Sequence, residues 1–348
     1  MTESAQDGPP LRCGVIGVGR MGRHHARVYA QTTGADLVAV LDQNPERARD
    51  ITEQWGGHAC ASLEELLDRG IDAVTVATPT THHRDAVLPL LRAGVSCLVE
   101  KPLAPDIEQS RAIADEARHA DAVLQVGHIV RFDPVMVAVR EIDDLRPRFI
   151  EIDRISPMTF RSVDVGVVLD MMIHDLDLLL MMLGREPATI QASAVAVLGD
   201  VEDVCNARLT FSPDADGATC VANVTASRLA LKTERKLRII SEDCYISADF
   251  GKRSITFVQK TANASQLEDL RQRLRAGEDL SSLDYASLMH VETLPVGDDE
   301  PLKLQIEDFL HAVRTGRQPT IDAEAGFAAV RTAERIVEAA RASGDLTI

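Results

Sequence analysis

Short apolar runs alternate with longer amphipathic stretches in the first third of the chain. The amphipathic stretches follow the runs, and several open with a capping residue such as Asn44 before Pro45, Ser62 or Asp106. The apolar runs, which we interpret as strands, cover residues 11–16, 36–41, 72–77, 95–100 and 122–126. Repeated strand and helix units of this length predict a doubly wound parallel sheet, of the α/β class, over residues 11–130.

The pattern changes after about Asp133, where apolar and polar residues begin to alternate. This alternation predicts strands at residues 148–155, 189–197, 204–211, 220–227, 236–240 and 254–258. Helical sequence returns at 302–314 and 323–341. We therefore expect a second, α+β domain over residues 131–348. A charged stretch at 266–278 is interpreted as a solvated insertion, with a partner-binding helix as the alternative.

One stretch, residues 166–184, is apolar at nearly every position and is bounded by glycine at both ends, which predicts a single buried helix. At about 100° per residue, Asp170, His174 and Asp177 fall on one strip of this helix, and Asp175 points away from it. Buried ionisable groups are costly unless they are paired or face a wet cavity. The strip therefore indicates either a structural Asp/His pair or a functional site.

Composition and charge narrow the class of protein. A chain of 348 residues is longer than one domain with a single hydrophobic core usually is, which agrees with two domains. Its formal net charge of −17 argues against nucleic acid as a partner. Six cysteines without zinc-like spacing indicate reduced core residues, no metal site and a cytoplasmic protein. Residues 1–10 are polar and predict a disordered tail rather than a signal peptide. No window is apolar enough to predict a membrane span.

A glycine motif follows the first predicted strand. The sequence from Gly17 to Gly22 reads G-V-G-R-M-G, and Asp42 stands at the end of the next strand, twenty residues beyond Gly22. Strand, glycine turn, helix, strand and acid together form the dinucleotide-binding fingerprint, in which Gly17 permits the tight turn and Gly19 lets the backbone approach a pyrophosphate. Asp42 would bind both ribose hydroxyls and repel a 2′-phosphate, so NAD is favoured. Arg47 is near enough to bind such a phosphate and keeps NADP as the alternative.

Polar groups follow three of the predicted strands, at the edge where parallel sheets bind their ligands. These groups are Thr78-Pro79 with His82, Glu100-Lys101-Pro102, and Gly127-His128. The proline after Lys101 restricts this lysine to an extended backbone and so directs its ammonium group. An ordinary surface lysine is the alternative interpretation.

Five motifs, in this order and spacing, resemble the Gfo/Idh/MocA oxidoreductase family. They are Gly17-Val-Gly-Arg-Met-Gly22, Thr78-Pro79 with His82, Glu100-Lys101-Pro102, Val126-Gly127 with Arg131-Phe132, and Asp170-x-x-x-His174-Asp175. The resemblance implies an N-terminal Rossmann domain and a C-terminal domain with an open, mostly antiparallel sheet. It also implies final helices that pack back on the Rossmann domain, and a homodimer or homotetramer. The implied NAD-binding residues are Gly17, Gly19, Arg20, Met21, Gly22, Asp42, Thr78, Pro79, His82, Glu100 and Lys101.

The same resemblance makes Lys101, Asp170 and His174 the catalytic group of a dehydrogenase. A hydroxyl loses its proton as its carbon loses hydride, and this step needs a base near neutral pH. His174 is expected to take the proton, Asp170 to orient and polarise His174, and Lys101 to hydrogen-bond the developing alkoxide. Whether His174 or Lys101 is the base stays open.

Arginines on either side of the buried helix could meet an anionic ligand. Arg131, Arg154, Arg161 and Arg228 predict the mouth of a diphosphate-binding pocket, with ordinary solvated arginines as the alternative. The expected substrate-binding set is Lys101, Arg131, Arg154, Arg161, Asp170 and His174.

Residues 149–180 resemble the branch of the family that oxidises the 3-hydroxyl of UDP-N-acetylglucosamine. The resemblance implies a nucleotide-sugar substrate and a product that supplies the amino sugar of amide-linked lipid A. A free polyol or sugar such as an inositol is the alternative substrate. A nucleotide-binding regulatory protein without catalysis is the alternative function.

Overall fold

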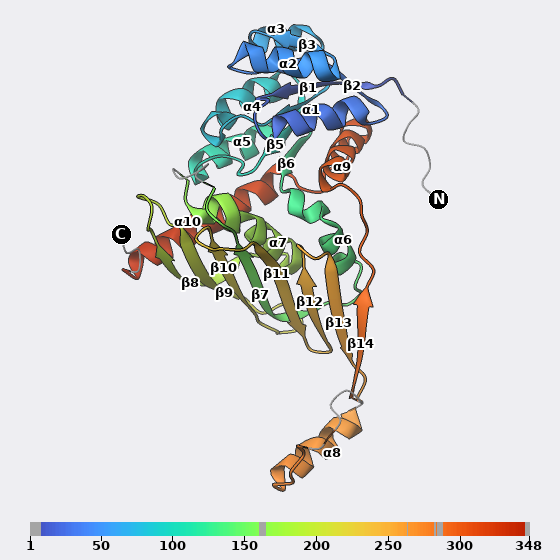
Figure 1. The fold of residues 1–348 in the computed structure, drawn as a ribbon, viewed down its shortest axis with the longest axis vertical. Coiled ribbons are helices and arrows are strands. Elements are labelled where there is room, and N and C mark those ends of the chain that lie inside the picture. Colours follow the sequence, from blue (N-terminus) through green and yellow to red (C-terminus); the bar gives the residue numbers. More distant parts are fainter. Residues whose placement is uncertain (1–7, 160–164, 263, 282, 284–287, 345–348) are drawn as a thin grey trace.

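The first sheet contains six parallel strands in the order β3-β2-β1-β4-β5-β6 (Figure 1). The computed structural model describes residues 8–159, 165–262, 264–281, 283 and 288–344, so most of the expected N-terminal tail lies outside it. The strands are β1 (Leu11–Ile16), β2 (Ala35–Leu41), β3 (His58–Cys60), β4 (Ala73–Val76), β5 (Ser96–Glu100) and β6 (Leu124–Gly127). The doubly wound parallel sheet is confirmed. The short edge strand β3 was not among the expected strands because it has no apolar run of its own.

The helices of this part are α1 (Gly22–Gln31), α2 (Pro45–Trp55), α3 (Leu63–Asp68), α4 (His83–Arg92) and α5 (Ile107–His119). Asn44, Ser62 and Asp106 cap α2, α3 and α5 by accepting backbone N–H bonds of 2.9, 3.2 and 2.7 Å. These bonds confirm the capping interpretation, because each satisfies a donor that the first helical turn leaves free. Helix α4 begins at His83, directly after a 3-10 turn at Thr80–His82.

The second sheet has eight strands in the order β14-β13-β12-β11-β7-β10-β9-β8. The strands are β7 (Pro147–Ile155), β8 (Pro187–Val195), β9 (Val204–Phe211), β10 (Cys220–Ser227), β11 (Glu234–Ser241), β12 (Cys244–Asp249), β13 (Ser254–Lys260) and β14 (Met289–Leu294). Only β10 and β7 run parallel, so the open, mostly antiparallel sheet is confirmed. Strands β12 and β14 were not expected. Strand β14 has no buried residue, and so lacks the alternation that marks a half-buried strand.

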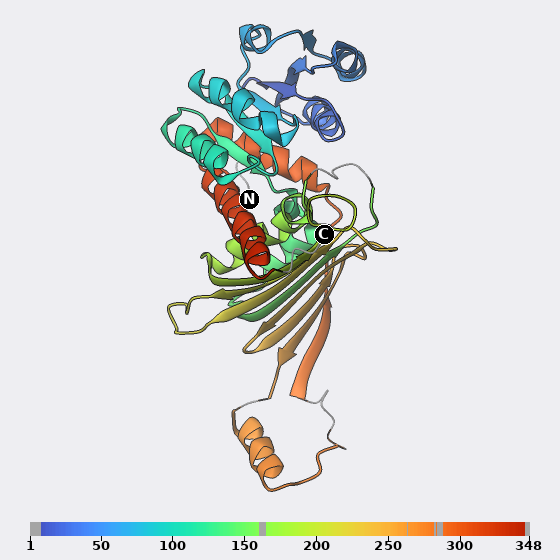
Figure 2. The same ribbon diagram turned by 90° about the vertical axis from the view of Figure 1, so that its left-hand side faces the viewer.

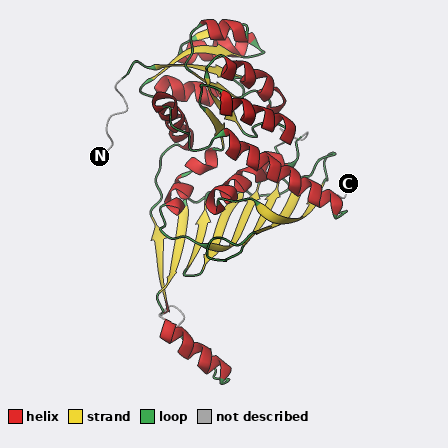
Figure 3. Ribbon diagram, turned by 180° about the vertical axis from the view of Figure 1, so that it is seen from behind, coloured by secondary structure: helices red, strands yellow, loops and turns green. Residues whose placement is uncertain are grey.

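Helices lie on one face of this sheet. Helices α6 (Pro134–Arg140), α7 (Ile173–Leu183) and α10 (Ala323–Ala342) lie between the sheet and the Rossmann part, and no helix of the described residues covers the opposite face (Figure 2). The view from behind shows the same layers (Figure 3). Helix α8 (Ala264–Arg275) projects from the end of the β13–β14 hairpin (Figure 1). Among the described residues, no helix is both long and apolar enough to cross a bilayer.

The last two helices connect the two parts of the molecule. In α9 (Pro301–Thr315), Phe309 is buried in a cluster with Tyr29 on one side of the parallel sheet. In α10, Phe327 joins the cluster on the other side of that sheet, and Ile336 joins the core of the second sheet. Because α10 is shared between these two cores, it joins the parallel sheet to the second sheet.

The buried helix that the sequence predicted over 166–184 is not a single α-helix. Its first turn, Val168–Met172, is a π-helix. Helix α7 then covers Ile173–Leu183 and is followed by Gly184, which has a left-handed backbone. Glu202 holds this start, since its side chain accepts a bond of 3.2 Å from the backbone N–H of Val168. A Cβ on Gly166 would lie 2.0 Å from Glu202 Oε1, so any side chain here would displace the Glu202 carboxylate. The π turn widens the helix at Asp170, a feature often found at functional sites.

Candidate active site

The glycine-rich turn between β1 and α1 has the backbone that a dinucleotide site needs. Gly17 has a φ of +83°, a left-handed conformation that favours glycine. A Cβ on Gly22 would lie 1.8 Å from the carbonyl oxygen of Gly17, whereas a Cβ on Gly19 would meet no atom within 4 Å. The turn therefore packs tightly against α1 and leaves open space at the helix N-terminus, where a pyrophosphate can be held by backbone N–H groups.

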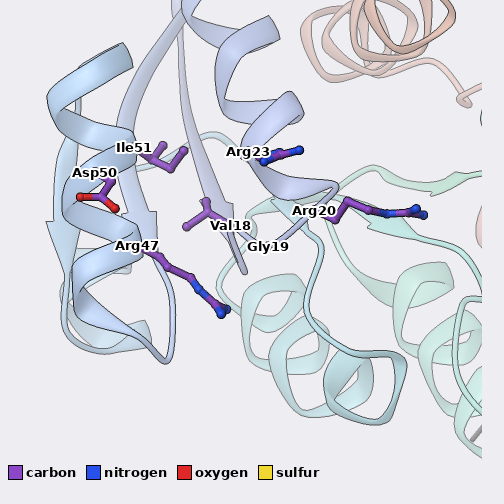
Figure 4. Close-up of a pocket in the computed structure, with 7 residues that line it drawn as sticks. All are labelled: Val18, Gly19, Arg20, Arg23, Arg47, Asp50 and Ile51. Atoms are coloured by element: carbon purple, nitrogen blue, oxygen red, sulfur yellow. The ribbon is translucent and has the colours of Figure 1, made fainter. Parts of the chain in front are cut away.

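A cavity of about 960 Å³ runs along this turn. Among the residues that line it are the sequence-predicted Gly17, Gly19, Arg20, Asp42, Thr78, Pro79 and His82. Asp42 is held at the wall because its carboxylate accepts bonds of 2.8 Å from the backbone N–H groups of Val18 and Asn44. Figure 4 shows the adjoining hollow, where Arg47 reaches from α2 toward Gly19 and Arg20 points away from α2. These residues fit a dinucleotide.

A second cavity, of about 590 Å³, lies between the Rossmann part and the second sheet, and Arg20 lines both cavities. Its lining includes the predicted residues Arg20, Met21, Glu100, Lys101, Arg154, Asp170, His174 and Arg228, and also Arg235, which was not predicted. The structure thus brings the catalytic candidates next to the end of the dinucleotide cavity. Residues from β5, β7, β11 and the start of the buried helix meet there.

Lys101 and Asp170 form a direct contact in this second cavity. The Lys101 ammonium donates to the backbone carbonyl of Asp170 at 2.6 Å and to its carboxylate at 3.3 Å. We expected Asp170 to orient His174 instead. That expectation is corrected, because the described structure has no hydrogen bond between the Asp170 and His174 side chains. Asp170 therefore positions the ammonium of Lys101.

Glu100 is fixed by a histidine that the sequence analysis missed. His25 of α1 is fully buried, and its Nε2 lies 2.9 Å from Glu100 Oε1 while its Nδ1 lies 3.2 Å from the hydroxyl oxygen of Thr75. Burial favours neutral Glu100, but the bond from His25 and the charges of His25 and Lys101 outweigh it and lower the Glu100 pKa. Glu100 is thus a carboxylate beside Lys101. The sequence pattern could have identified His25, because it is a polar residue on the side of α1 that faces the sheet.

His83 performs a similar task at the edge of the first cavity. This buried side chain places Nε2 3.1 Å from the carbonyl oxygen of Thr78 and Nδ1 3.1 Å from that of Pro102. It therefore ties the loop after β4 to the loop that carries Lys101. The sequence analysis chose the neighbouring His82, which lines the cavity.

His128 is buried and packs against half-buried His174, which lines the second cavity. Their rings meet edge to face, with centroids 6.3 Å apart. His174 Nδ1 and both ring nitrogens of His128 have no hydrogen-bond partner among the described residues. Burial, followed by the positive charges of Lys101 and Arg154, holds the His174 pKa well below its usual range, and burial also lowers the His128 pKa. His174 is therefore a neutral imidazole near pH 7 and can accept a proton.

This pair should make folding stability depend on pH. The unfolded chain takes up a proton on His128 near its ordinary pKa of about 6.5, whereas the folded chain does so only at lower pH. The free energy of unfolding should therefore fall below pH 6.5, by up to about 1.4 kcal/mol per pH unit for His128. Urea denaturation between pH 7.5 and 5.5 measures this slope. His128→Phe should flatten it and the exposed control His119→Phe should not; equal slopes in all three proteins would contradict the expectation.

Arg154 and Arg228 lie at the cavity wall with carboxylate partners. Arg154 donates two bonds, of 2.8 and 2.6 Å, to buried Asp175, and Arg228 donates one of 2.7 Å to buried Asp203. Asp175, which the helical strip analysis set aside, is thus the residue that holds Arg154 in place. Both guanidinium groups are buried and neutralised, so neither is an ordinary solvated arginine.

Of the arginines predicted for the diphosphate mouth, Arg131 lies away from this cavity. Arg131 does not line the cavity, because it donates bonds of 2.7 and 2.6 Å to the buried carboxylate of Asp177 and one of 3.2 Å to the carbonyl of Thr320. Asp177 is therefore a structural partner of Arg131, and not a third member of the cavity-facing strip. Arg161 lies outside the described residues.

The fold and the site define a class of protein. The chain has a Rossmann sheet with a glycine-rich turn, an acid at the end of β2, and a pocket with Lys101 and His174 beside the dinucleotide cavity. These features are typical of a two-domain, dinucleotide-dependent oxidoreductase. Within the described residues, no group of His, Cys, Asp and Glu side chains is arranged to hold a metal ion.

Comparison with known proteins gives the family. Residues 11–128 match the model "Oxidoreductase family, NAD-binding Rossmann fold", and residues 141–247 match "GFO/IDH/MocA C-terminal domain". UDP-N-acetylglucosamine 3-dehydrogenase of Acidithiobacillus ferrooxidans is 34% identical over 316 residues, 91% of this chain and 93% of that protein. Inositol 2-dehydrogenase of Rhizobium meliloti is 35% identical over 207 residues, 56% of this chain and 62% of that protein.

Solved structures agree with this result. A structure of the Acidithiobacillus ferrooxidans UDP-N-acetylglucosamine 3-dehydrogenase matches with a TM-score of 0.84 and 32% identity, covering 96% of this chain and 99% of that one. Levoglucosan dehydrogenase in complex with NADH and L-sorbose matches with a TM-score of 0.80 over 96% of this chain and 98% of that one, and at 20% identity shows a likeness of fold.

The chain belongs to the Gfo/Idh/MocA oxidoreductase family, and it is an NAD-dependent dehydrogenase. The family resemblance, the enzyme class and the cofactor expected from the sequence are thereby confirmed. The alternative of a regulatory protein without catalysis is not retained.

Proposed function

We propose that this protein oxidises a secondary hydroxyl of a sugar to a ketone with NAD, and that the substrate is UDP-N-acetylglucosamine, oxidised at its 3-hydroxyl. One observation carries the proposal: Lys101 and His174 line one cavity that adjoins the dinucleotide cavity at Arg20. The similarity to UDP-N-acetylglucosamine 3-dehydrogenase over 91% of the chain supports the choice of substrate. In this proposal the product supplies the 3-amino sugar of lipid A.

In the proposed mechanism the residues of the chain manage the proton. Bound NAD supplies the hydride acceptor. His174, a neutral imidazole inside the cavity, takes the proton of the substrate hydroxyl. Lys101, held by Asp170, donates a hydrogen bond to the oxygen as negative charge develops on it. Glu100, whose pKa is lowered, places a negative charge beside Lys101.

The proposed cofactor-binding set keeps the predicted residues. The turn from Gly17 to Gly22 holds the pyrophosphate, Asp42 binds the ribose of the adenosine half, and Thr78, Pro79 and His82 line the cavity toward the nicotinamide end. Glu100 and Lys101, which line the second cavity, would contact the nicotinamide half.

Asp42→Ala should weaken NADH binding by roughly 10- to 100-fold, since a carboxylate loses its bonds to ribose hydroxyls. It should also reduce any preference for NADH over NADPH. Fluorescence titration measures both dissociation constants, and Asp36→Ala, at the other end of β2, is the control. Unchanged NADH affinity in Asp42→Ala would remove Asp42 from the site.

Mass spectrometry tests the substrate directly. The purified protein is incubated with NAD, 2-oxoglutarate and UDP-N-acetylglucosamine, with myo-inositol and glucose in parallel reactions. The 2-oxo acid is included to reoxidise any NADH that stays bound. Loss of two hydrogens from the nucleotide sugar is the expected result, and oxidation of a neutral polyol alone would overturn the proposed substrate.

A free polyol is the second candidate substrate. The similarity to inositol 2-dehydrogenase, 35% identical over 56% of the chain, favours it. In this case the cavity arginines would serve only to hold the fold, and their replacement would not discriminate charged from neutral substrates.

We also propose that the protein is a cytoplasmic homodimer or homotetramer. The sheet face that no described helix covers exposes Val195, Ile240 and Val291, at 41%, 41% and 56% of their surface. Exposed apolar residues gathered on one face are typical of an interface. Light scattering after size exclusion measures the molar mass, and a monomer would contradict the proposal.

A further inference from the structure

Arg235 lies at the start of β11, on the sheet face that lines the second cavity. Leu237 and Ile239 follow it at intervals of two and are buried, which places all three side chains on the same face. In the ladder between β11 and β7, Arg235 stands directly opposite Arg154. Two arginines therefore face each other on the wall of the cavity.

The two arginines differ in their partners. Arg154 is neutralised by buried Asp175. The side chain of Arg235 makes no hydrogen bond or ion pair with any residue that the structure describes, although the carboxylates of Asp175 and Asp133 act on it from a distance. Like charges directly opposite in an antiparallel ladder destabilise the pair. Arg235 thus brings a positive charge to the cavity that the fold itself does not compensate.

Arg235 is exposed to solvent, but it lines the cavity and stands opposite a second arginine, and this place separates it from the arginines of the outer surface. Partial burial and then the charge of Arg154 lower its pKa, as expected for a cation held near another cation, but a guanidinium remains protonated at neutral pH. The whole chain carries a formal net charge of −17, so an anion is repelled by most of the molecule. An unneutralised arginine on a cavity wall is what an anionic ligand group would need there.

We propose that Arg235 binds the diphosphate of the substrate. This inference rests on the proposed function and deepens it. Lys101 and His174 would contact the reacting hydroxyl, and Arg235 lies on the cavity wall that the second sheet forms, where it would meet the diphosphate of the same nucleotide sugar. The planar guanidinium fork matches two phosphate oxygens. Arg154 and Arg228 line the wall around Arg235. Because Asp175 and Asp203 already bind these two arginines, we expect Arg235 to make the main contact with the anion.

The test uses UDP as the probe, with NADH held at saturation so that the dinucleotide cavity is filled. Isothermal titration calorimetry on the full chain compares wild type with Arg235→Gln. We expect the dissociation constant for UDP to rise 10- to 100-fold, the loss of one charge-assisted phosphate contact. Arg238→Gln is the matched control, because Arg238 lies on the same strand but on the opposite face, paired with Glu151. D-glucuronate is titrated in the same way as a second probe, because its anionic group is a carboxylate and not a phosphate.

The outcomes separate this inference from the proposed function. Loss of UDP affinity in Arg235→Gln supports Arg235 even if the wild type does not oxidise UDP-N-acetylglucosamine. If the wild type oxidises the nucleotide sugar and Arg235→Gln keeps its Michaelis constant and UDP affinity, the inference is overturned and the function stands. An effect on glucuronate alone would also overturn it, since the anion would then be a carboxylate.

Discussion

His174→Ala is expected to lower kcat by roughly 10²- to 10⁴-fold and to leave NADH binding unchanged. The range is that of a general base in other enzymes. His174 lines the second cavity but not the dinucleotide cavity, so its replacement should not change the affinity for the cofactor. Its low pKa, caused first by burial, keeps the imidazole neutral and able to accept the hydroxyl proton. Single-turnover reduction of NAD measures the effect on the chemical step.

Two controls keep this result interpretable. His119→Ala removes an exposed histidine of α5 and should retain wild-type turnover. Added imidazole should restore part of the activity of His174→Ala, because the truncated side chain leaves room for a small base in the same cavity. Wild-type turnover in His174→Ala would remove His174 from the mechanism. Loss of NADH affinity in the variant would show instead that the replacement disturbs the fold.

The elements of the fold were predictable because their physics is local. Strand periodicity, caps such as Asn44 and the spacing from Gly22 to Asp42 are properties of short segments, and the structure reproduces each of them. The two cavity residues Lys101 and His174 were predictable for a related reason. Each stands in a short motif whose local sequence is unusual for a core.

The partners within the site were not predictable, because they depend on contacts between distant segments. Asp175 and Asp177 are two residues apart, yet they bind Arg154 and Arg131, which lie on β7 and in the turn after β6. Helical periodicity assigned Asp177 to the cavity strip and Asp175 to none. The π turn at Val168–Met172, set by Glu202 from a distant loop, shifts Asp170 relative to the residues that follow. No pattern inside residues 166–184 reports that shift.

The same limit explains the choice of arginines. From the sequence, Arg131 and Arg235 are equivalent cations near predicted strands. In the structure, Arg131 is saturated by Asp177 while Arg235 has no such partner among the described residues. An arginine that is already paired with a carboxylate of the protein is less able to bind an anionic ligand, and these pairings depend on the fold. That information is absent from residue type and spacing.

Lys101→Met is expected to lower kcat by about 10²- to 10³-fold, the loss reported for removal of one preorganised donor to a developing oxyanion. The methionine keeps most of the volume of the lysine stem but removes the ammonium that Asp170 holds at 2.6 Å. The Michaelis constant should change less than kcat, because the charge on the substrate oxygen exists mainly in the transition state. Steady-state rates over a range of substrate concentrations measure both, and replacement of the exposed Lys303 of α9, Lys303→Met, is the control.

A second variant at the same position decides between the two roles that Lys101 can have. If Lys101 only donates a hydrogen bond, Lys101→Arg should recover part of the activity lost in Lys101→Met, since arginine is also a cationic donor. If Lys101 is the base, Lys101→Arg should be as inactive as Lys101→Met, because a guanidinium does not give up its proton at neutral pH. The proposed mechanism, with His174 as base, requires the first result. Lys101 contacts Asp170 and not His174, so the two side chains act on each other only through the substrate oxygen that both contact. The loss of kcat in the double variant Lys101→Met/His174→Ala should therefore be smaller than the product of the two single losses.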